Sequence, residues 1–553
     1  MMWLSGRMPL LWKILRNRER PGEGSRHEKS AAKGQGYIYV PNYLMSRNNI
    51  MNKSGALGCL CVLVLFMSAC AGFNGENTAD RPLAGEETAH EERYEAEDAQ
   101  IRGKIIRQTE KEGFSGTSYV SGFTEEGDKI IFTIKNEKDG FYDLVFRASG
   151  IGGKKENTIY VDGKCEGILL TEESDVFLDS VLKRVYLTRG EHKITLEKDW
   201  GWLDLDCLYL KESAPMDDEV YQASGVLADK EADACAEELM KYLCGIYGEK
   251  ILSGQYSLYG PDGKEIQLIN RLTGEYPAIL GMDMKDYSLT AAERGAQPQV
   301  TEWAEEYWEK GGIIALSWHW LLPDRYVRGE WWQALYADET TIDLDAVLNG
   351  RDKEGCELLM KDMDRMALEL QKLQKQDIPV LWRPFHEADG GWFWWSRGGP
   401  DCYKKLWRLM FDKFTREYDL HNLIWVYSGM GEEWYPGDAY VDIIGEDIYP
   451  AKSCISAQGD KFLNALDYTD TVKPVMLSES GFLPEPENAA RDGIYWLGCV
   501  LWGEDYLIRE PGCGGHSDHL LPGSVIKNFY NNDKVITRKE LPDFKGIIAL
   551  SQS

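Results

Sequence analysis

Residues 381–395 read LWRPFHEADGGWFWW, and this stretch decides how the chain is interpreted. The apolar run at residues 379–382 is typical of a short buried strand. Its polarity changes abruptly at Arg383, His386 and Glu387, and an Asp-Gly-Gly turn follows. Titratable side chains at the C-terminal end of a buried strand are the pattern of an active site on parallel strands.

Glu387 is the residue of this stretch best suited to chemistry. Residues 392–395, WFWW, follow it closely, and a carboxylic acid among indoles has the raised pKa that a general acid needs at neutral pH. Flat aromatic faces also hold the apolar face of a sugar ring. The alternative is a structural carboxylate that is ion-paired with Arg383, with the tryptophans as core.

From residue 251 onward, apolar strands alternate with amphipathic helices. Eight strands are expected, at residues 251–256, 277–284, 313–320, 379–387, 423–428, 441–449, 475–480 and 495–502. Helices are expected at 232–247, 300–310, 358–375, 403–417 and 460–468, among others. Eight such units predict an α/β fold, a (β/α)8 TIM barrel over residues 219–553. No GxGxxG follows the first strand, which disfavours a dinucleotide site.

The expected strand ends carry carboxylates, imidazoles and aromatic rings, in particular at His319, His386–Glu387, Glu446–Asp447, Tyr449, Glu479 and Trp502. Glu387 and Glu479 lie on opposing strands, and a separation of about 5–5.5 Å between them would give a retaining double displacement. Glu387, among tryptophans, would be the acid/base, and Glu479, between two serines, the nucleophile. A metal shared by His319 and His386 is disfavoured, so no cofactor is expected for catalysis.

Residues 93–212 show short alternating runs separated by turns, with Asp-Gly pairs at 139–140 and 162–163. This pattern predicts an antiparallel β-sandwich in front of the barrel. Residues 71–92 are polar and acidic, as in a disordered tether.

Residues 51–70 have the proportions of an export signal, with a basic start at Met51, a short apolar run and a small-residue site before Cys70. We interpret residues 1–70 as a start codon assigned too early plus a signal peptide; an amphipathic targeting extension is the alternative for residues 1–50. The end of this signal, residues 67–70, resembles a bacterial lipobox, which implies a lipid on Cys70 and a cell-surface or secreted protein.

The formal net charge of −29 argues against a nucleic-acid partner and suits a neutral polysaccharide. The cysteines are dispersed without CxxC spacing, so a zinc site is not expected. A bridge such as Cys235 with Cys244 stays open. A monomer is expected, with membrane contact only through the lipid.

The stretch at 381–395 resembles the acid/base motif of glycoside hydrolase family 26, the β-mannanase family. The resemblance extends to Ser-Gly-Gln at 253–255, to 311–320, 434–445 and 473–481. It implies that Glu387 is the acid/base and Glu479 the nucleophile. It also implies that His319, His386, Trp392, Asp447, Tyr449 and Trp502 support or line the sugar site. Ala388 and Asp389 stand where these mannanases usually carry Met-Asn, and Glu446 is an additional acid.

Residues 94–210 resemble a family 35 carbohydrate-binding module, on the YEAED start at 94–98, the segment 113–120 and the closing strand 203–210. The resemblance implies a structural calcium held by Glu95, Glu97 and Asp206, whose hard oxygens suit that ion; ordinary solvated strand-end acids are the alternative. For sugar contact, Trp200 and Trp202 are the candidates.

Together, these features favour an exported, retaining endo-β-1,4-mannanase that acts on mannan or galactomannan. A mixed-linkage β-glucanase or β-1,3-xylanase on the same scaffold is the first alternative. A surface glycan-binding protein without catalysis is the second, although both glutamates are present.

Overall fold

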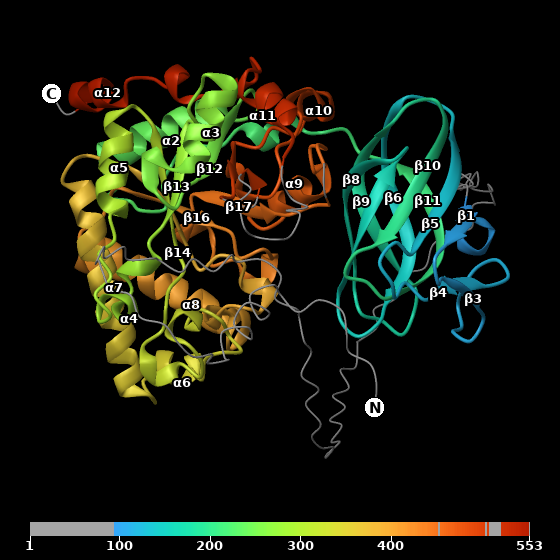
Figure 1. The fold of residues 1–553 in the computed structure, drawn as a ribbon, viewed down its shortest axis with the longest axis horizontal. Coiled ribbons are helices and arrows are strands. Elements are labelled where there is room, and N and C mark those ends of the chain that lie inside the picture. The colour runs from blue at the N-terminus through green and yellow to red at the C-terminus, as the bar shows by residue number, and fades with distance from the viewer. Residues whose placement is uncertain (1–92, 452–453, 504–505, 508–520, 552–553) are drawn as a thin grey trace, which may run out of the picture. The chain divides into compact units, whose positions relative to one another are not determined.

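The computed structural model describes residues 93–451, 454–503, 506–507 and 521–551. Antiparallel strands extend to residue 212, and strands alternating with helices begin after residue 233 (Figure 1). The expected signal peptide, Cys70 and the tether lie outside the described residues.

The N-terminal part is the predicted antiparallel β-sandwich. One sheet contains β1 (Arg93–Glu95), β3 (Ile106–Gln108), β4 (Tyr119–Ser121), β6 (Gly140–Gly150), β9 (Leu178–Leu187) and β11 (Leu203–Glu212). The other contains β2 (Gln100–Arg102), β5 (Lys129–Asn136), β7 (Lys155–Val161), β8 (Lys164–Thr171) and β10 (Gly190–Lys198). Every second residue of β5, namely Ile130, Phe132 and Ile134, is buried in the shared core, which accounts for the alternating sequence.

The C-terminal part is the predicted TIM barrel. Its strands are β12 (Ile251–Tyr256), β13 (Ile279–Asp283), β14 (Ile313–Trp318), β15 (Val380–Pro384), β16 (Leu423–Tyr427), β17 (Ile443–Ile448), β18 (Val475–Ser480) and β19 (Gly498–Leu501). All neighbours are parallel, and β12 pairs with both β19 and β13, so the sheet closes. The short β20 (Val535–Ile536) adds to β12. All eight expected strands are present, six of them shorter than expected.

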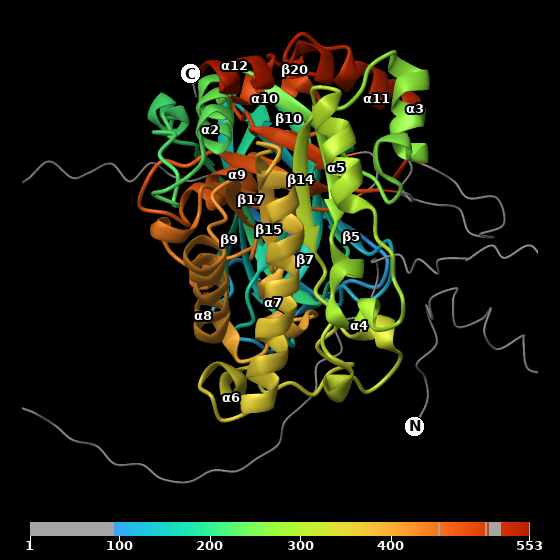
Figure 2. The ribbon, with the colours of Figure 1, turned by 90° about the vertical axis from the view of Figure 1, so that its left-hand side faces the viewer.

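Helices cover the outside of the barrel: α2 (Ala234–Ile246), α3 (Lys264–Thr273), α4 (Leu289–Ala292), α5 (Val300–Glu309), α6 (Leu344–Leu348), α7 (Lys353–Gln374), α8 (Gly399–Asp412), α9 (Gly459–Leu466), α10 (Pro486–Asp492), α11 (Gly523–Tyr530) and α12 (Phe544–Ser551). Figure 2 shows α5 and α7 over β14 and β15. In α7, Leu359, Met363, Met366 and Leu370 recur at helical spacing and are buried. The strands beneath are buried on both faces and therefore read as continuous apolar runs.

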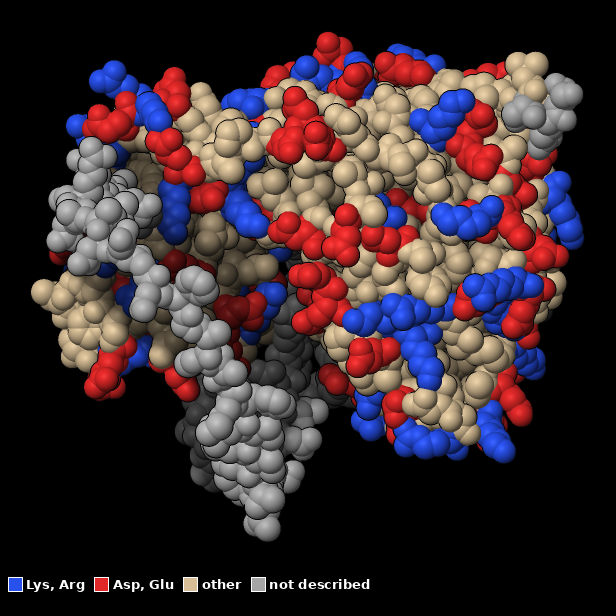
Figure 3. Space-filling view, turned by 180° about the vertical axis from the view of Figure 1, so that it is seen from behind, with Lys and Arg blue, Asp and Glu red and all other residues tan. Residues whose placement is uncertain are grey.

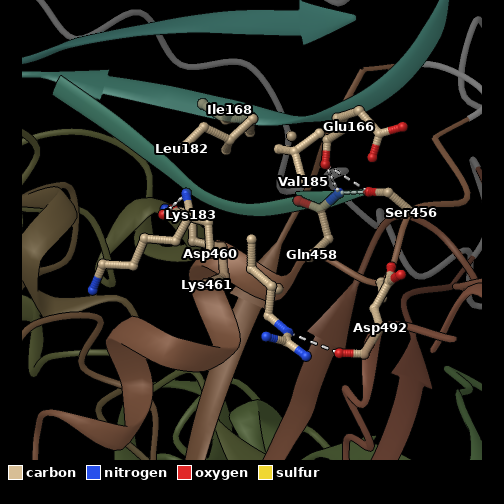
Figure 4. Close-up of a pocket in the computed structure, with 14 residues that line it drawn as sticks. Glu166, Ile168, Leu182, Lys183, Val185, Ser456, Gln458, Asp460, Lys461 and Asp492 are labelled. Atoms are coloured by element: carbon tan, nitrogen blue, oxygen red, sulfur yellow. Dashed lines mark hydrogen bonds between the residues drawn. The ribbon is translucent and has the colours of Figure 1, made fainter. Parts of the chain in front are cut away.

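A disulfide joins the two parts of the chain, between Cys165 of β8 and Cys454 in the segment between β17 and α9. Cys235 and Cys244 are free thiols, so the bridge considered for them is not formed. Beside the disulfide, Ser456 Oγ and Gln458 Nε2 donate hydrogen bonds to the carbonyl of Glu166, over 2.7 and 3.2 Å (Figure 4).

The surface is mixed in charge. On the face drawn in Figure 3, acidic and basic side chains lie among one another instead of forming a continuous basic patch. That arrangement agrees with the net charge of −29 in disfavouring a phosphate backbone as partner. No helix in the described ranges has the length and apolar character needed to cross a membrane.

Candidate active site

The backbone at the end of β15 makes an unusual turn that presents Glu387. Phe385 and Glu387 both have φ of 54°, a left-handed conformation that costs an L-residue about 1–2 kcal/mol. Three hydrogen bonds hold the turn, from the Tyr403 hydroxyl to the Phe385 carbonyl, from the Trp395 indole to the His386 carbonyl, and from the Glu387 amide to the Ser428 carbonyl. Strain that is held in this way is a mark of functional sites.

Glu387 lies in an environment that favours the neutral acid. The indole Nε1 of Trp392 donates to its Oε2 over 2.9 Å. Burial raises the pKa of Glu387 well above its usual range, and repulsion from Glu479 and Asp447 raises it further. A carboxyl group with this pKa can hold a proton at neutral pH and donate it, which is what a general acid must do.

Arg383 is the centre of a buried ion-pair network. Its Nη2 donates to Glu479 Oε2 over 2.6 Å, and its Nη1 donates to Asp447 Oδ2 over 2.8 Å. Nη2 also donates to the hydroxyl of Tyr256 over 2.9 Å. The ion pairs of this guanidinium are therefore those with Glu479 and Asp447, and the alternative in which Arg383 forms the ion pair of Glu387 is wrong.

Glu479, on β18, has a polar setting that differs from that of Glu387. Besides Arg383 on Oε2, the Tyr449 hydroxyl donates to Oε1 over 2.5 Å. A β-bulge between β17 and β18 brings Asp447 level with Glu479. Two donors, one of them a cation, stabilise negative charge on the Glu479 carboxylate.

Asp447 supports the site from behind. Its side chain has no exposed surface, and its Oδ1 accepts from Ser478 Oγ over 2.7 Å while Oδ2 is held by Arg383. Because one guanidinium serves two carboxylates, burial and Glu479 raise the pKa of Asp447 to about 7. Asp447 is therefore linked to Glu479 through Arg383, and its expected place among the residues that support or line the sugar site stays a prediction.

Asp283, at the end of β13, is a site residue that the sequence reasoning missed. Its Oδ2 is 2.8 Å from His319 Nδ1, and its Oδ1 accepts the His319 amide over 3.1 Å. His319 Nε2 is in turn 3.0 Å from His386 Nε2. Against the effect of burial, the interactions with His319 lower the pKa of Asp283, and burial lowers the pKa of His386 well below its usual range. The ends of β13, β14 and β15 thus share a chain from an ionised carboxylate to a neutral imidazole. In the sequence, the signal that could have revealed Asp283 is its position at the end of the second barrel strand.

Aromatic rings complete the site. Trp502 lies 4.8 Å from the Tyr256 ring and 6.1 Å from the His319 ring, measured between centroids. The structure therefore gathers the residues that were expected to line the sugar site: His319, His386, Trp392, Tyr449 and Trp502 around Glu387 and Glu479. The additional acid Glu446 is buried, and burial raises its pKa to about 8.

The acids of the predicted calcium site lie together in the sandwich. Ser115 Oγ donates to Glu95 Oε2 over 2.6 Å and lies 3.2 Å from both carboxylate oxygens of Asp206. Glu97 Oε1 accepts the amides of Thr117 and Ser118, while its buried Oε2 has no hydrogen-bond partner. Arg147 is ion-paired with Asp206. Across the described ranges, no three acidic, His or Cys side chains form a ready-made metal cluster.

The chain has a parallel barrel with two carboxyl groups in different settings at the ends of its fourth and seventh strands. Behind an antiparallel sandwich, this barrel defines a glycoside hydrolase with an accessory module. The family models agree with this class. Residues 228–539 match the model of glycosyl hydrolase family 26, and residues 92–213 match that of carbohydrate binding module family 35. The chain belongs to glycosyl hydrolase family 26.

Several relatives are similar along most of their length. The mannan endo-1,4-beta-mannosidase of Thermothelomyces thermophilus is 35% identical over 456 residues, which are 81% of this chain and 90% of that protein. Mannan endo-1,4-beta-mannosidase B of Piromyces sp is 31% identical over 82% of this chain and 77% of its own. The GH26-CBM35 beta-(1,4)-mannanase of Podospora anserina has a similar structure, with a TM-score of 0.57, 32% identity, and coverage of 82% of this chain and 99% of that one.

The hydrogen bond from Trp392 predicts how the activity depends on pH. The indole N–H stabilises the ionised form of Glu387 and so lowers its pKa. Trp392→Phe removes that donor, and the pKa of Glu387 rises. Since a general acid works protonated, the alkaline limb of kcat/KM should move to higher pH, by about half to one pH unit for a bond worth about 1 kcal/mol.

The matched control is Trp502→Phe, which alters an aromatic ring of the same site that makes no hydrogen bond to Glu387. Its alkaline limb should stay in place. If the alkaline limb of the kcat/KM profile moved to lower pH in Trp392→Phe, that result would contradict the assignment of this limb to Glu387.

Proposed function

We propose that this protein is a retaining endo-β-1,4-mannanase that hydrolyses mannan or galactomannan. The observation that carries the proposal is the 35% identity to the mannan endo-1,4-beta-mannosidase of Thermothelomyces thermophilus over 90% of that protein. The different settings of Glu387 and Glu479 support the retaining mechanism, because a double displacement needs one neutral acid and one ionised nucleophile.

In the first step, Glu479 attacks the anomeric carbon while Glu387 protonates the leaving glycosidic oxygen, and the C–O bond breaks. In the second step, the Glu387 carboxylate takes a proton from water, whose oxygen displaces Glu479. Arg383 and Tyr449 hold the two oxygens of Glu479 in place for both steps. The product keeps the β configuration, and Glu387 ends protonated as it began.

Variants of the two glutamates should separate their roles. Glu479→Ala should lose at least about a thousandfold in kcat on every substrate, because no nucleophile remains. Glu387→Ala should be as slow on polysaccharide, yet form the glycosyl-enzyme rapidly from an aryl mannobioside with a dinitrophenolate leaving group, which needs no protonation. Burst kinetics and product anomers by NMR report these outcomes; α-anomers as the first product would exclude retention.

Polysaccharide specificity is tested on galactomannan, glucomannan, xylan and mixed-linkage β-glucan. We expect reducing sugar from the first two, with long fragments appearing early if cleavage is internal. Release from xylan or β-glucan alone would exclude the mannanase while leaving the family and the catalytic pair intact. The double variant Glu387→Ala/Glu479→Ala controls for contaminating hydrolases.

The sandwich is proposed to bind polysaccharide and a structural calcium ion. Trp200 and Trp202, 41% and 54% exposed between β10 and β11, offer flat faces to a sugar chain. Glu97 Oε2 is a buried oxygen without a partner, and Glu95 and Asp206 lie beside it around Ser115. A hard cation would satisfy Glu97 and replace Arg147 as the partner of Asp206.

Calcium should therefore stabilise the protein. We expect the thermal unfolding midpoint to rise by several degrees with millimolar calcium and to fall again with EDTA. Glu97→Gln should abolish this rise, whereas Glu191→Gln, an exposed position on β10 in the other sheet, should retain it. A wild-type midpoint that does not respond to calcium would argue against the site.

The Cys165–Cys454 disulfide supports an exported location, because disulfides persist in oxidising compartments. We propose that a lipid on Cys70 holds the mature protein at the cell surface. We also propose that the protein is a monomer. The mass of the mature N-terminal peptide would test the lipid, and sedimentation the oligomeric state.

A further inference from the structure

Between β17 and α9, the described residues 449–451 and 454–458 include a donor to Glu479 and the attachment point of the sandwich. This segment begins beside Tyr449, which follows β17 and donates to Glu479 Oε1. Five residues further along the chain, Cys454 is covalently bound to Cys165 of the sandwich. The donor to the nucleophile therefore lies very near, in sequence, to a covalent attachment point on the other domain.

The end of this segment is buried and bonded to the sandwich. Cys454, Ser456, Ala457 and Gln458 are each at most 6% exposed. Ser456 and Gln458 donate to the carbonyl of Glu166, the residue after Cys165 (Figure 4). Three different bonds therefore meet at two consecutive residues of β8, which fixes the segment at that strand.

The backbone of Gln458 shows that the segment 454–458 is held in one specific conformation. Its φ is 54°, in the left-handed region that costs a residue with a side chain about 1–2 kcal/mol. Such a conformation persists only where the surroundings determine it. For Gln458, the side chain is held by hydrogen bonds to Glu166 and Ser456. The helix α9 that follows is held as well, because its Asp460 accepts the amide of Lys183 on β9.

We infer that the sandwich positions the catalytic nucleophile: the Cys165–Cys454 disulfide and the Glu166 contacts hold the segment 454–458, and through it Tyr449 against Glu479. Cys165 and Cys454 are then positioning residues for catalysis, in addition to any sugar that the sandwich binds. This inference rests on the proposed role of Glu479. It assigns to a carbohydrate-binding domain a part in the geometry of the reaction centre.

A double-mutant cycle tests it, because positioning through Tyr449 makes the two changes non-additive. On galactomannan, Cys165→Ser/Cys454→Ser should lower kcat about tenfold with little change in KM, as a displaced catalytic group does. Tyr449→Phe should lower kcat as well. When the cysteine changes are made in the Tyr449→Phe background, the further loss should be less than about twofold.

Two further variants make the experiment decisive. Gln458→Ala keeps the disulfide and removes the bond to Glu166, so it should show the same coupling to Tyr449→Phe even if the cysteine variant does not fold. Cys356→Ser, a free cysteine of α7, should leave kcat unchanged. Equal losses of kcat with and without the Tyr449 hydroxyl would overturn the inference alone, since the disulfide would then act independently of Tyr449. Full activity of Glu479→Ala would overturn the proposed mechanism and this inference together.

Discussion

One buried guanidinium holds the candidate active site together. Arg383 is 3% exposed and binds Glu479 on one amino group and Asp447 on the other. Without it, two carboxylates would remain buried and uncompensated, and breaking a buried ion pair costs about 3–5 kcal/mol. The same cation lowers the cost of keeping Glu479 charged beside Glu387, whose own charge is disfavoured by burial. The contrast between the settings of Glu387 and Glu479 therefore depends on where Arg383 points.

Much of the fold could be predicted because its signals are local. The alternation in β5 and the continuous apolar run of β14 are direct consequences of one-sided and two-sided burial. Strand ends were harder, since a strand such as β15 stops at Pro384 while the apolar and aromatic character continues into the turn. Extra elements such as β20 are too short to produce a periodic pattern.

Site residues could be predicted where a reactive side chain stands at a strand end. Which side chains contact one another was harder to predict. Glu387 and Glu479 stand at strand ends in recognisable surroundings. The partner of Arg383 could not be deduced, because Glu387, Asp447 and Glu479 all interact with it and only the barrel's closure decides which of them form its ion pairs. Asp283 was overlooked because the second strand end carries no aromatic neighbour in sequence. The pairing of Cys165 with Cys454 spans 289 residues, beyond the reach of any spacing argument.

The disulfide also changes what the segment between the two folded parts has to do. Strand β11 ends at Glu212 and α2 begins at Ala234, and the chain between them is the usual target of proteases in a modular enzyme. Here that segment lies inside the ring closed by Cys165 and Cys454. A single cut within it leaves two fragments that are still covalently joined. In a medium rich in proteases, the enzyme can therefore be nicked between its domains and still keep the sandwich attached to the barrel.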